Sequence, residues 1–156
     1  MKFGIRFIDY LGTIRQRVEL TVLAEKAGFE FAWYPHDTFM HNTWVITAAA
    51  ALQTSKIKIG SVGTNPFTTN PAEIATYIAS LDELSGGRAV LGLGLHTHEM
   101  VEWTGTDASH SIEATREATE IIRALLRGEV VDYQGAHFQW SDQCYLRMKP
   151  VRAEVP

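Results

Sequence analysis

The segment Ala79–Leu95, ASLDELSGGRAVLGLGL, constrains the fold more than any other part of the chain. Apolar residues recur at helical spacing up to and within it, which predicts an amphipathic helix with one buried stripe: Ile74, Ile78, Leu81 and Leu84. Gly86 and Gly87 predict its end, because glycine adopts the left-handed conformation of C-terminal caps without a steric penalty. Ala89–Leu95 is almost continuously apolar, as in a parallel strand covered on both faces. In such α/β folds, ligands bind at the carboxyl ends of the strands.

Similar units recur along the chain. We expect strands at Lys2–Ile8, Phe31–Tyr34, Lys56–Val62 and Ala89–Leu95, and helices at Thr13–Ala27, Thr43–Thr54, from Pro71 onward, and at Ile112–Leu126, with a long loop over His96–Ser111. Residues 1–128 thus form four strand–helix units of one α/β domain with a parallel sheet, either open or part of a barrel. Residues 129–156 begin with a predicted hairpin, Val130–Tyr133 and Ala136–Trp140. A full eight-stranded barrel typically needs ~250 residues, so this chain supplies about half.

Composition excludes several classes of protein. Hydrophobic residues make up 46% and charged residues 21% of the 156 residues, which is typical of a folded globular domain. The formal net charge of −4 disfavours nucleic-acid binding. No apolar run approaches the ~18 residues of a membrane span, and no secretory signal opens the chain, so we expect no membrane contact and a cytoplasmic location. Cys144 is the only cysteine, which suits a reducing compartment.

Several stretches together resemble a known superfamily. They are MKFGIRF, KIKIGSVGTNPFTTNPAEIA, IASLDELSGGRAVLGLG, LLRGEVVDYQGAHFQW and LRMKPVR, in order along essentially the whole chain. These stretches resemble the luciferase-like monooxygenase superfamily, and within it most closely the deazaflavin-dependent reductases such as methylenetetrahydromethanopterin reductase. The TNP loop joined to SLDELSGGR, and YQGxHF shortly before KPVR, are the most specific parts of the resemblance.

The resemblance implies the N-terminal half of a (β/α)8 TIM barrel, with residues 129–156 leading toward a missing fifth strand. The implied coenzyme is F420, an 8-hydroxy-5-deazaflavin, with FMN as the alternative. The implied reaction is hydride transfer between the reduced deazaflavin and a small organic substrate. In the resembling reductases a bulge with a non-proline cis peptide backs the coenzyme ring. Carried over, this bond is Val62–Gly63, and Thr64 and Asn65 then bind the polar edge of the ring.

The loop after the second strand departs from the family. Many relatives carry Asp-His followed by an aromatic residue there, with the histidine near the reacting carbon, whereas this chain has Asp37, Thr38 and Phe39. His36 stands one residue early, and a shift of one residue on an extended segment turns a side chain to the other face. We therefore expect Asp37 to act near the substrate, with His36 as the less favoured catalytic candidate and a solvated polar loop as the alternative.

Arg6 is a second departure from the family. The resembling methanopterin enzymes often carry an acid at this position of the first strand, and a guanidinium favours an anionic partner instead. The alternative is a salt-bridged or solvent-facing arginine. Because of this replacement, we do not expect this chain to share the methanopterin substrate.

His96 and His98 end the fourth strand, and the resemblance places them beside the coenzyme at the edge of the pocket. In an extended segment they share one face, as a two-histidine metal pair does, and His36 or Asp37 would be the candidates for a further ligand. We favour the coenzyme interpretation and expect no metal. On the fourth helix, the charged residues Arg116, Glu117, Glu120 and Arg123 predict a solvated face.

Three other functions compete with an F420-dependent oxidoreductase. They are an FMN-dependent monooxygenase of the same superfamily, a non-catalytic half-barrel for binding or assembly, and, more remotely, a metal-dependent hydrolase. Four strands of a barrel leave two open edges and an uncovered apolar face, and such surfaces drive association. We therefore expect a homo-oligomer that takes a small-molecule substrate.

Overall fold

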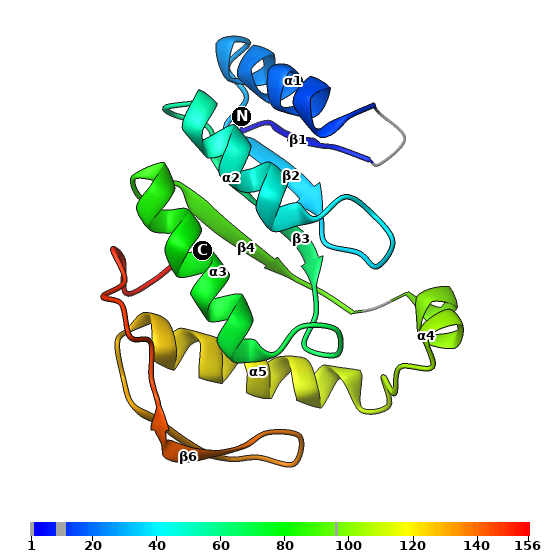
Figure 1. Cartoon of the computed structure of the whole chain (residues 1–156), viewed down its shortest axis with the longest axis vertical. Coiled ribbons are helices and arrows are strands. Elements are labelled where there is room, and N and C mark those ends of the chain that lie inside the picture. Colours follow the sequence, from blue (N-terminus) through cyan, green and yellow to red (C-terminus); the bar gives the residue numbers. More distant parts are fainter. Residues whose placement is uncertain (1, 9–11, 96) are drawn as a thin grey trace.

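The structure is a computed structural model that describes residues 2–8, 12–95 and 97–156 (Figure 1). The elements in chain order are β1 (Gly4–Arg6), α1 (Ile14–Lys26), β2 (Phe31–Pro35), α2 (Thr43–Gln53), β3 (Lys58–Thr64), α3 (Pro71–Ser85), β4 (Ala89–Leu93), α4 (His98–Thr104), α5 (Ser111–Leu126), β5 (Val131–Gln134) and β6 (Gln139–Cys144). The expected units and the hairpin are therefore confirmed. Within the described residues, no helix is both long enough and apolar enough to cross a membrane.

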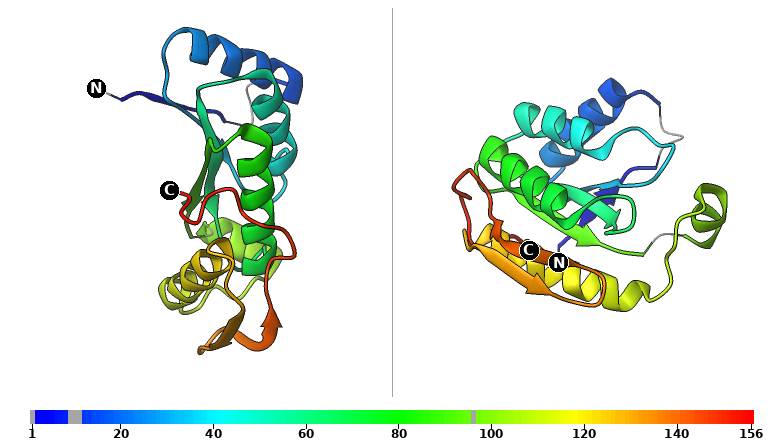
Figure 2. Two further views of the ribbon diagram at one scale, coloured as in Figure 1. Left: turned by 90° about the vertical axis from the view of Figure 1, so that its left-hand side faces the viewer. Right: turned by 60° about the horizontal axis from the view of Figure 1, so that its bottom comes forward.

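The four strands β1 to β4 form one parallel sheet in chain order. Helices α1, α2 and α3 lie side by side on one face of this sheet, and α5 follows α3 in the row (Figure 2). The core between the layers includes Ile59 and Ile74, both 0% exposed. The opposite face of the sheet carries the register row Arg6, Trp33, Gly60 and Val90, one residue from each strand.

The turn that joins α3 to β4 follows the sequence prediction. Asn70 caps the start of α3 by accepting the Ala72 amide, and Pro71 occupies the first turn. Gly86 ends the helix in the left-handed conformation with φ 68°. The prediction that Leu84 belongs to the buried apolar stripe is wrong, because Leu84 is 45% exposed.

Arg88, the residue after this turn, links the α3–β4 turn to the α2–β3 connection. Its side chain is partly buried, and each of its five N–H donors makes a hydrogen bond. The acceptors lie at the ends of α2 and α3 and before β3: the carbonyls of Ala51, Thr54, Ile57 and Ser85 and the Thr54 hydroxyl. Arg88 therefore satisfies carbonyl groups that helix ends leave without intrahelical partners.

Two further side chains stabilise the amino-terminal end of the sheet. Glu25, from α1, accepts the amides of Ser55, Lys56 and Ile57 in the α2–β3 connection. Burial alone would raise the pKa of Glu25, but these backbone donors outweigh it and lower the pKa. Asp82 of α3 is buried and accepts the Ala89 amide at 3.1 Å.

The chain after the hairpin returns to the sheet. Arg152 donates from Nε to Asp82 Oδ2 at 2.9 Å and from Nη2 to the Ala89 carbonyl at 2.8 Å. The amide of Leu91 in β4 donates to the carbonyl of Pro156 at 2.8 Å. The end of the described chain therefore lies along β4 on the side away from β3.

Several sequence predictions need correction. β1 is shorter than the predicted Lys2–Ile8, and the predicted loop over His96–Ser111 contains the short helix α4. The second hairpin strand runs over Gln139–Cys144, later than the predicted Ala136–Trp140. Strand bounds depend on which residues find a partner strand, and of the described residues in the first segment only Gly4–Arg6 pair in register with β2.

The predicted fourth helix is α5 in the structure. The prediction that Glu117 lies on its solvated face is wrong. This side chain is 6% exposed and accepts the amides of Ala136, His137 and Phe138 in the hairpin turn, at 2.9 to 3.1 Å. Glu120 accepts the Tyr133 hydroxyl at 2.6 Å. The hairpin therefore covers one face of α5, a contact that helical spacing alone does not reveal.

We predict that Arg88→Ala lowers the free energy of unfolding by about 2–4 kcal/mol, because it leaves several buried carbonyl groups without donors. Arg127→Ala is the matched control: it removes only the surface pair with Glu129 and should change stability by less than about 1 kcal/mol. Urea denaturation measures both variants. Equal losses would show that the Arg88 hydrogen bonds do not stabilise the turn.

Glu117 makes stability depend on pH. Burial raises its pKa, but the three amide donors outweigh burial and hold the pKa below its ordinary value of 4.5. A carboxylate with a depressed folded pKa stabilises the fold above its unfolded pKa, and this contribution disappears as pH falls below 4.5 through the folded pKa. We predict that Glu117→Gln is less stable near neutral pH and loses stability less steeply under acid than the wild type. Thermal denaturation across this range checks it, with Glu19→Gln on the exposed part of α1 expected to keep the wild-type slope.

Candidate functional site

A cavity of about 130 Å³ lies where the strands of the parallel sheet end. Every strand contributes to it: Arg6 from β1, Pro35, His36 and Asp37 at the end of β2, Val62 and Gly63 from β3, and Leu95 and Thr97 after β4. Parallel strands bring their carboxyl ends to one edge of a sheet, so residues far apart in sequence meet there. The cavity combines both charge signs with an apolar and glycine surface, and it is our candidate active site.

The β3 bulge forms one wall of this cavity. Ser61 pairs with Leu91 and Thr64 with Leu93, so β3 has one residue more than β4 over this stretch and Val62 and Gly63 bulge out of register. Gly63 has φ 79°, a conformation that favours glycine, and a Cβ built there would meet no atom within 4 Å. The bulge expected from the family is therefore present. The expected cis bond at Val62–Gly63 is wrong, because every peptide bond in the described residues is trans.

The end of β2 separates the two candidate catalytic residues. Alternation along the strand places Ala32 and Tyr34 against the helices, where they are 0% and 1% exposed, and His36 follows on that side. The His36 ring lies 5.7 Å from the ring of Trp44 in α2. Asp37 follows on the face of the sheet without helices, half-buried, and its Oδ1 accepts the Thr38 amide at 2.8 Å. This geometry agrees with the preference for Asp37, whose catalytic role stays a prediction.

Thr64 and Asn65 hold the loop rather than line the cavity. Thr64 is 0% exposed and its hydroxyl donates to Ser61 Oγ at 2.7 Å. Asn65 is 1% exposed, and its Oδ1 accepts the amides of Phe67 and Thr68 and the Thr68 hydroxyl, all at 3.1 Å. Their predicted contact with the coenzyme stays a prediction, and in this structure both side chains bond within their own loop.

Of the two histidines after β4, only His98 is described by the structure, and it does not line the cavity. His96 lies outside the described residues. His98 begins α4, is largely exposed, and its Nε2 lies 3.3 Å from Glu102 Oε1 one turn further along. Among the residues that the structure describes, no group of three His, Cys, Asp or Glu side chains has the geometry of a metal site.

Sequence reasoning missed three residues that line the cavity, namely Pro35, Leu95 and Thr97. None has a side chain that suggests chemistry. Their signal is positional, because each lies at or just after the carboxyl end of a strand, where side chains face a common opening.

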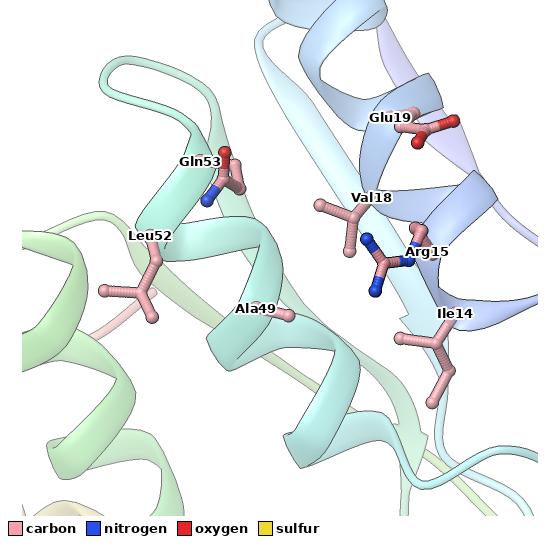
Figure 3. Close-up of a pocket in the computed structure, with 7 residues that line it drawn as sticks. All are labelled: Ile14, Arg15, Val18, Glu19, Ala49, Leu52 and Gln53. Carbon is pink, nitrogen blue, oxygen red and sulfur yellow. The ribbon is translucent and has the colours of Figure 1, made fainter.

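A larger groove of about 600 Å³ lies between α1 and α2 (Figure 3). Ile14 and Val18 face Ala49 across it, and Arg15 and Glu19 lie at its side. The groove is on the helix layer, and no residue at a strand end lines it. Its polar lining residues Arg15, Glu19 and Gln53 come from two helices and not from strand ends, where ligands of such folds bind, so the smaller cavity is the better candidate.

The chain is similar to one known protein family and to curated relatives. The family model "Luciferase-like monooxygenase" matches residues 2–156. A 5,10-methylenetetrahydromethanopterin reductase from Archaeoglobus fulgidus is 36% identical over 141 residues, which cover 90% of this chain and 42% of the relative. The chain thus spans less than half the length of this curated relative.

Several solved structures have the same fold over nearly the whole of this chain. The coenzyme F420 dependent tetrahydromethanopterin reductase from Methanopyrus kandleri superposes with a TM-score of 0.87 and 30% identity, covering 95% of this chain and 46% of that one. An F420-dependent secondary alcohol dehydrogenase, in complex with an F420-acetone adduct, has a TM-score of 0.85 and 27% identity, covering 100% and 51%. An FMN-bound type II Baeyer–Villiger monooxygenase from Pseudomonas putida has a TM-score of 0.82, covering 100% and 50%, but its 22% identity shows the fold alone.

We predict that Gly63→Val costs about 1–3 kcal/mol of stability, because a β-branched residue is strained at φ 79°. The valine side chain also enters the open space beside the bulge and should weaken the binding of any ligand there. Gly28→Val is the matched control, since Gly28 has φ 86° and equally open surroundings in the α1–β2 turn, away from the cavity. Thermal melts should show similar losses for both. A ligand affinity reduced equally in both variants would argue against a role for the bulge.

Proposed function

The chain belongs to the luciferase-like monooxygenase family, and from this premise we propose that it is the N-terminal, ring-binding half of an F420-dependent oxidoreductase. The proposed reaction is hydride transfer between the reduced deazaflavin and a small organic substrate. The Gly63 bulge at the carboxyl ends of the parallel strands is the observation that carries this proposal. The greater identity to F420-dependent enzymes than to the FMN-bound monooxygenase favours the deazaflavin.

The residues at the strand ends suit a planar ring. The bulge offers an uncharged surface formed by Val62 and by a glycine without a side chain. Gly92 of β4 and Gly94 just after it approach β3 so closely that a Cβ would lie 2.7 Å (Gly92) or 2.9 Å (Gly94) from the β3 backbone. These glycines keep the wall thin and flat beside the bulge, which favours face-on contact with an aromatic ring.

We assign the following roles on this basis. The coenzyme supplies the hydride chemistry, and the protein supplies binding, orientation and exclusion of water. Val62 and Gly63 pack against the ring, while Thr64 and Asn65 keep the loop beneath it in shape. Asp37 contacts the substrate from the sheet face without helices, and His36 supports the loop through Trp44.

Location, assembly and substrate class are further parts of the proposal. We propose a cytoplasmic homo-oligomer that acts on a small molecule, and the F420-acetone adduct of the secondary alcohol dehydrogenase supports the small substrate. The activity of the whole enzyme belongs to a barrel of which this chain is about half, so coenzyme binding is the property that tests the chain itself.

We predict that the 156-residue chain binds coenzyme F420 at least about tenfold more tightly than FMN. Titration of each oxidised coenzyme, followed by the fluorescence of its ring, measures both dissociation constants. Gly63→Val should weaken F420 binding, whereas Gly28→Val should leave it unchanged. Binding of FMN with no binding of F420 would favour the flavin monooxygenase alternative, and binding of neither would favour a non-catalytic half-barrel.

A further inference from the structure

We propose that Arg6 binds one anionic oxygen group, a carboxylate or a phosphate, of the ligand that occupies the cavity at the strand ends. The inference rests on the proposed function in assigning this cavity to substrate and coenzyme. It adds a requirement on the ligand, which must bring a single negative charge close to β1.

The backbone of β1 directs Arg6 toward the cavity. Phe7 is 1% exposed and stacks on Tyr34 with ring centroids 5.0 Å apart, so it faces the helices. Alternation then turns Arg6 to the opposite face, where it pairs in register with Trp33 and lines the cavity beside Gly63. Its position follows from the strand and not from a flexible loop.

Arg6 differs from the other cations on this face of the sheet. Lys2 and Lys58 both pair with Glu30, at 3.2 and 3.1 Å. Among the described residues, by contrast, no carboxylate lies within ion-pair distance of the Arg6 guanidinium. Asp37 lines the same cavity, but it makes no ion pair with Arg6. The positive charge at the end of β1 is therefore available to a ligand.

The chemistry of the cavity selects the kind of group. A guanidinium presents a planar fork of donors that matches the two oxygens of a carboxylate or phosphate. The cavity of about 130 Å³ has room for such a functional group, and the rest of a larger ligand would extend out of it along the glycine wall. The negative charge of Asp37 disfavours a second anion there, which is why we infer one anionic group.

The test uses the whole 156-residue chain and small probes of equal shape. Acetate and its neutral counterpart acetamide are titrated at constant ionic strength, with amide chemical shifts of residues 4–7 and 62–64 as the readout. We expect acetate, but not acetamide, to shift these signals, and Arg6→Gln to weaken acetate binding about tenfold. Asp37→Asn should strengthen it. Arg15→Gln is the matched control, because it removes the same charge from the helix groove outside the cavity.

The source of the anionic group is decided by a second arm that repeats the F420 titration with Arg6→Gln. A loss of F420 affinity identifies a phosphate or carboxylate of the coenzyme. Unchanged F420 affinity with lost acetate binding identifies the substrate.

The proposal is overturned if Arg6→Gln and Arg15→Gln affect acetate equally, or if acetamide binds as well as acetate. Thermal melts confirm that Arg6→Gln is folded. Because acetate binding requires no coenzyme, it can succeed where the F420 titration fails, so the two proposals are rejected separately.

Discussion

The arrangement of the sheet depends on the hydrogen bonds that the Arg88 guanidinium donates. It donates to carbonyls at the ends of α2 and α3 and before β3, and so holds together two strand–helix units that the backbone ladder alone does not orient. Glu25 and Asp82 add acceptors for backbone amides at the same end of the sheet. These contacts are local in space but distant in sequence, and they satisfy polar groups that connections between helices and strands would otherwise leave unpaired.

This distribution separates stability from function along the strands. The amino-terminal end is held by the hydrogen bonds of the partly buried Arg88 and Glu25 and the buried Asp82, whereas the carboxyl-terminal end carries a bulge, glycines and the side chains of Arg6 and Asp37. A barrel enzyme benefits from such a division, because a rigid lower end allows the upper end to present side chains selected for binding. The proposed roles of Val62, Gly63 and Asp37 all lie at that upper end.

Much of the candidate site follows from the sequence, with identifiable failures. The position of Asp37 on the sheet face without helices, and of His36 toward Trp44, follows from strand alternation. The bulge at Gly63 is present, but the trans peptide bond differs from the family expectation. Thr64 and Asn65 look like ligand contacts in sequence and instead bond to their own loop, because their burial depends on how that loop folds over β3.

The sequence by itself determined the four strand–helix units and the glycine stop before β4, because apolar periodicity and helix-capping residues act over a few neighbouring positions. Membership of the family followed separately, from the resemblance of whole sequence stretches to known relatives. Only the tertiary structure decided that Glu117 binds the hairpin turn, that Arg152 pairs with Asp82, and that Arg6 faces the cavity without a carboxylate partner among the described residues. The physical reason is the same in each case. A charged side chain is stabilised by whichever polar groups the fold brings to it, and these come from segments many residues away, which no local pattern specifies.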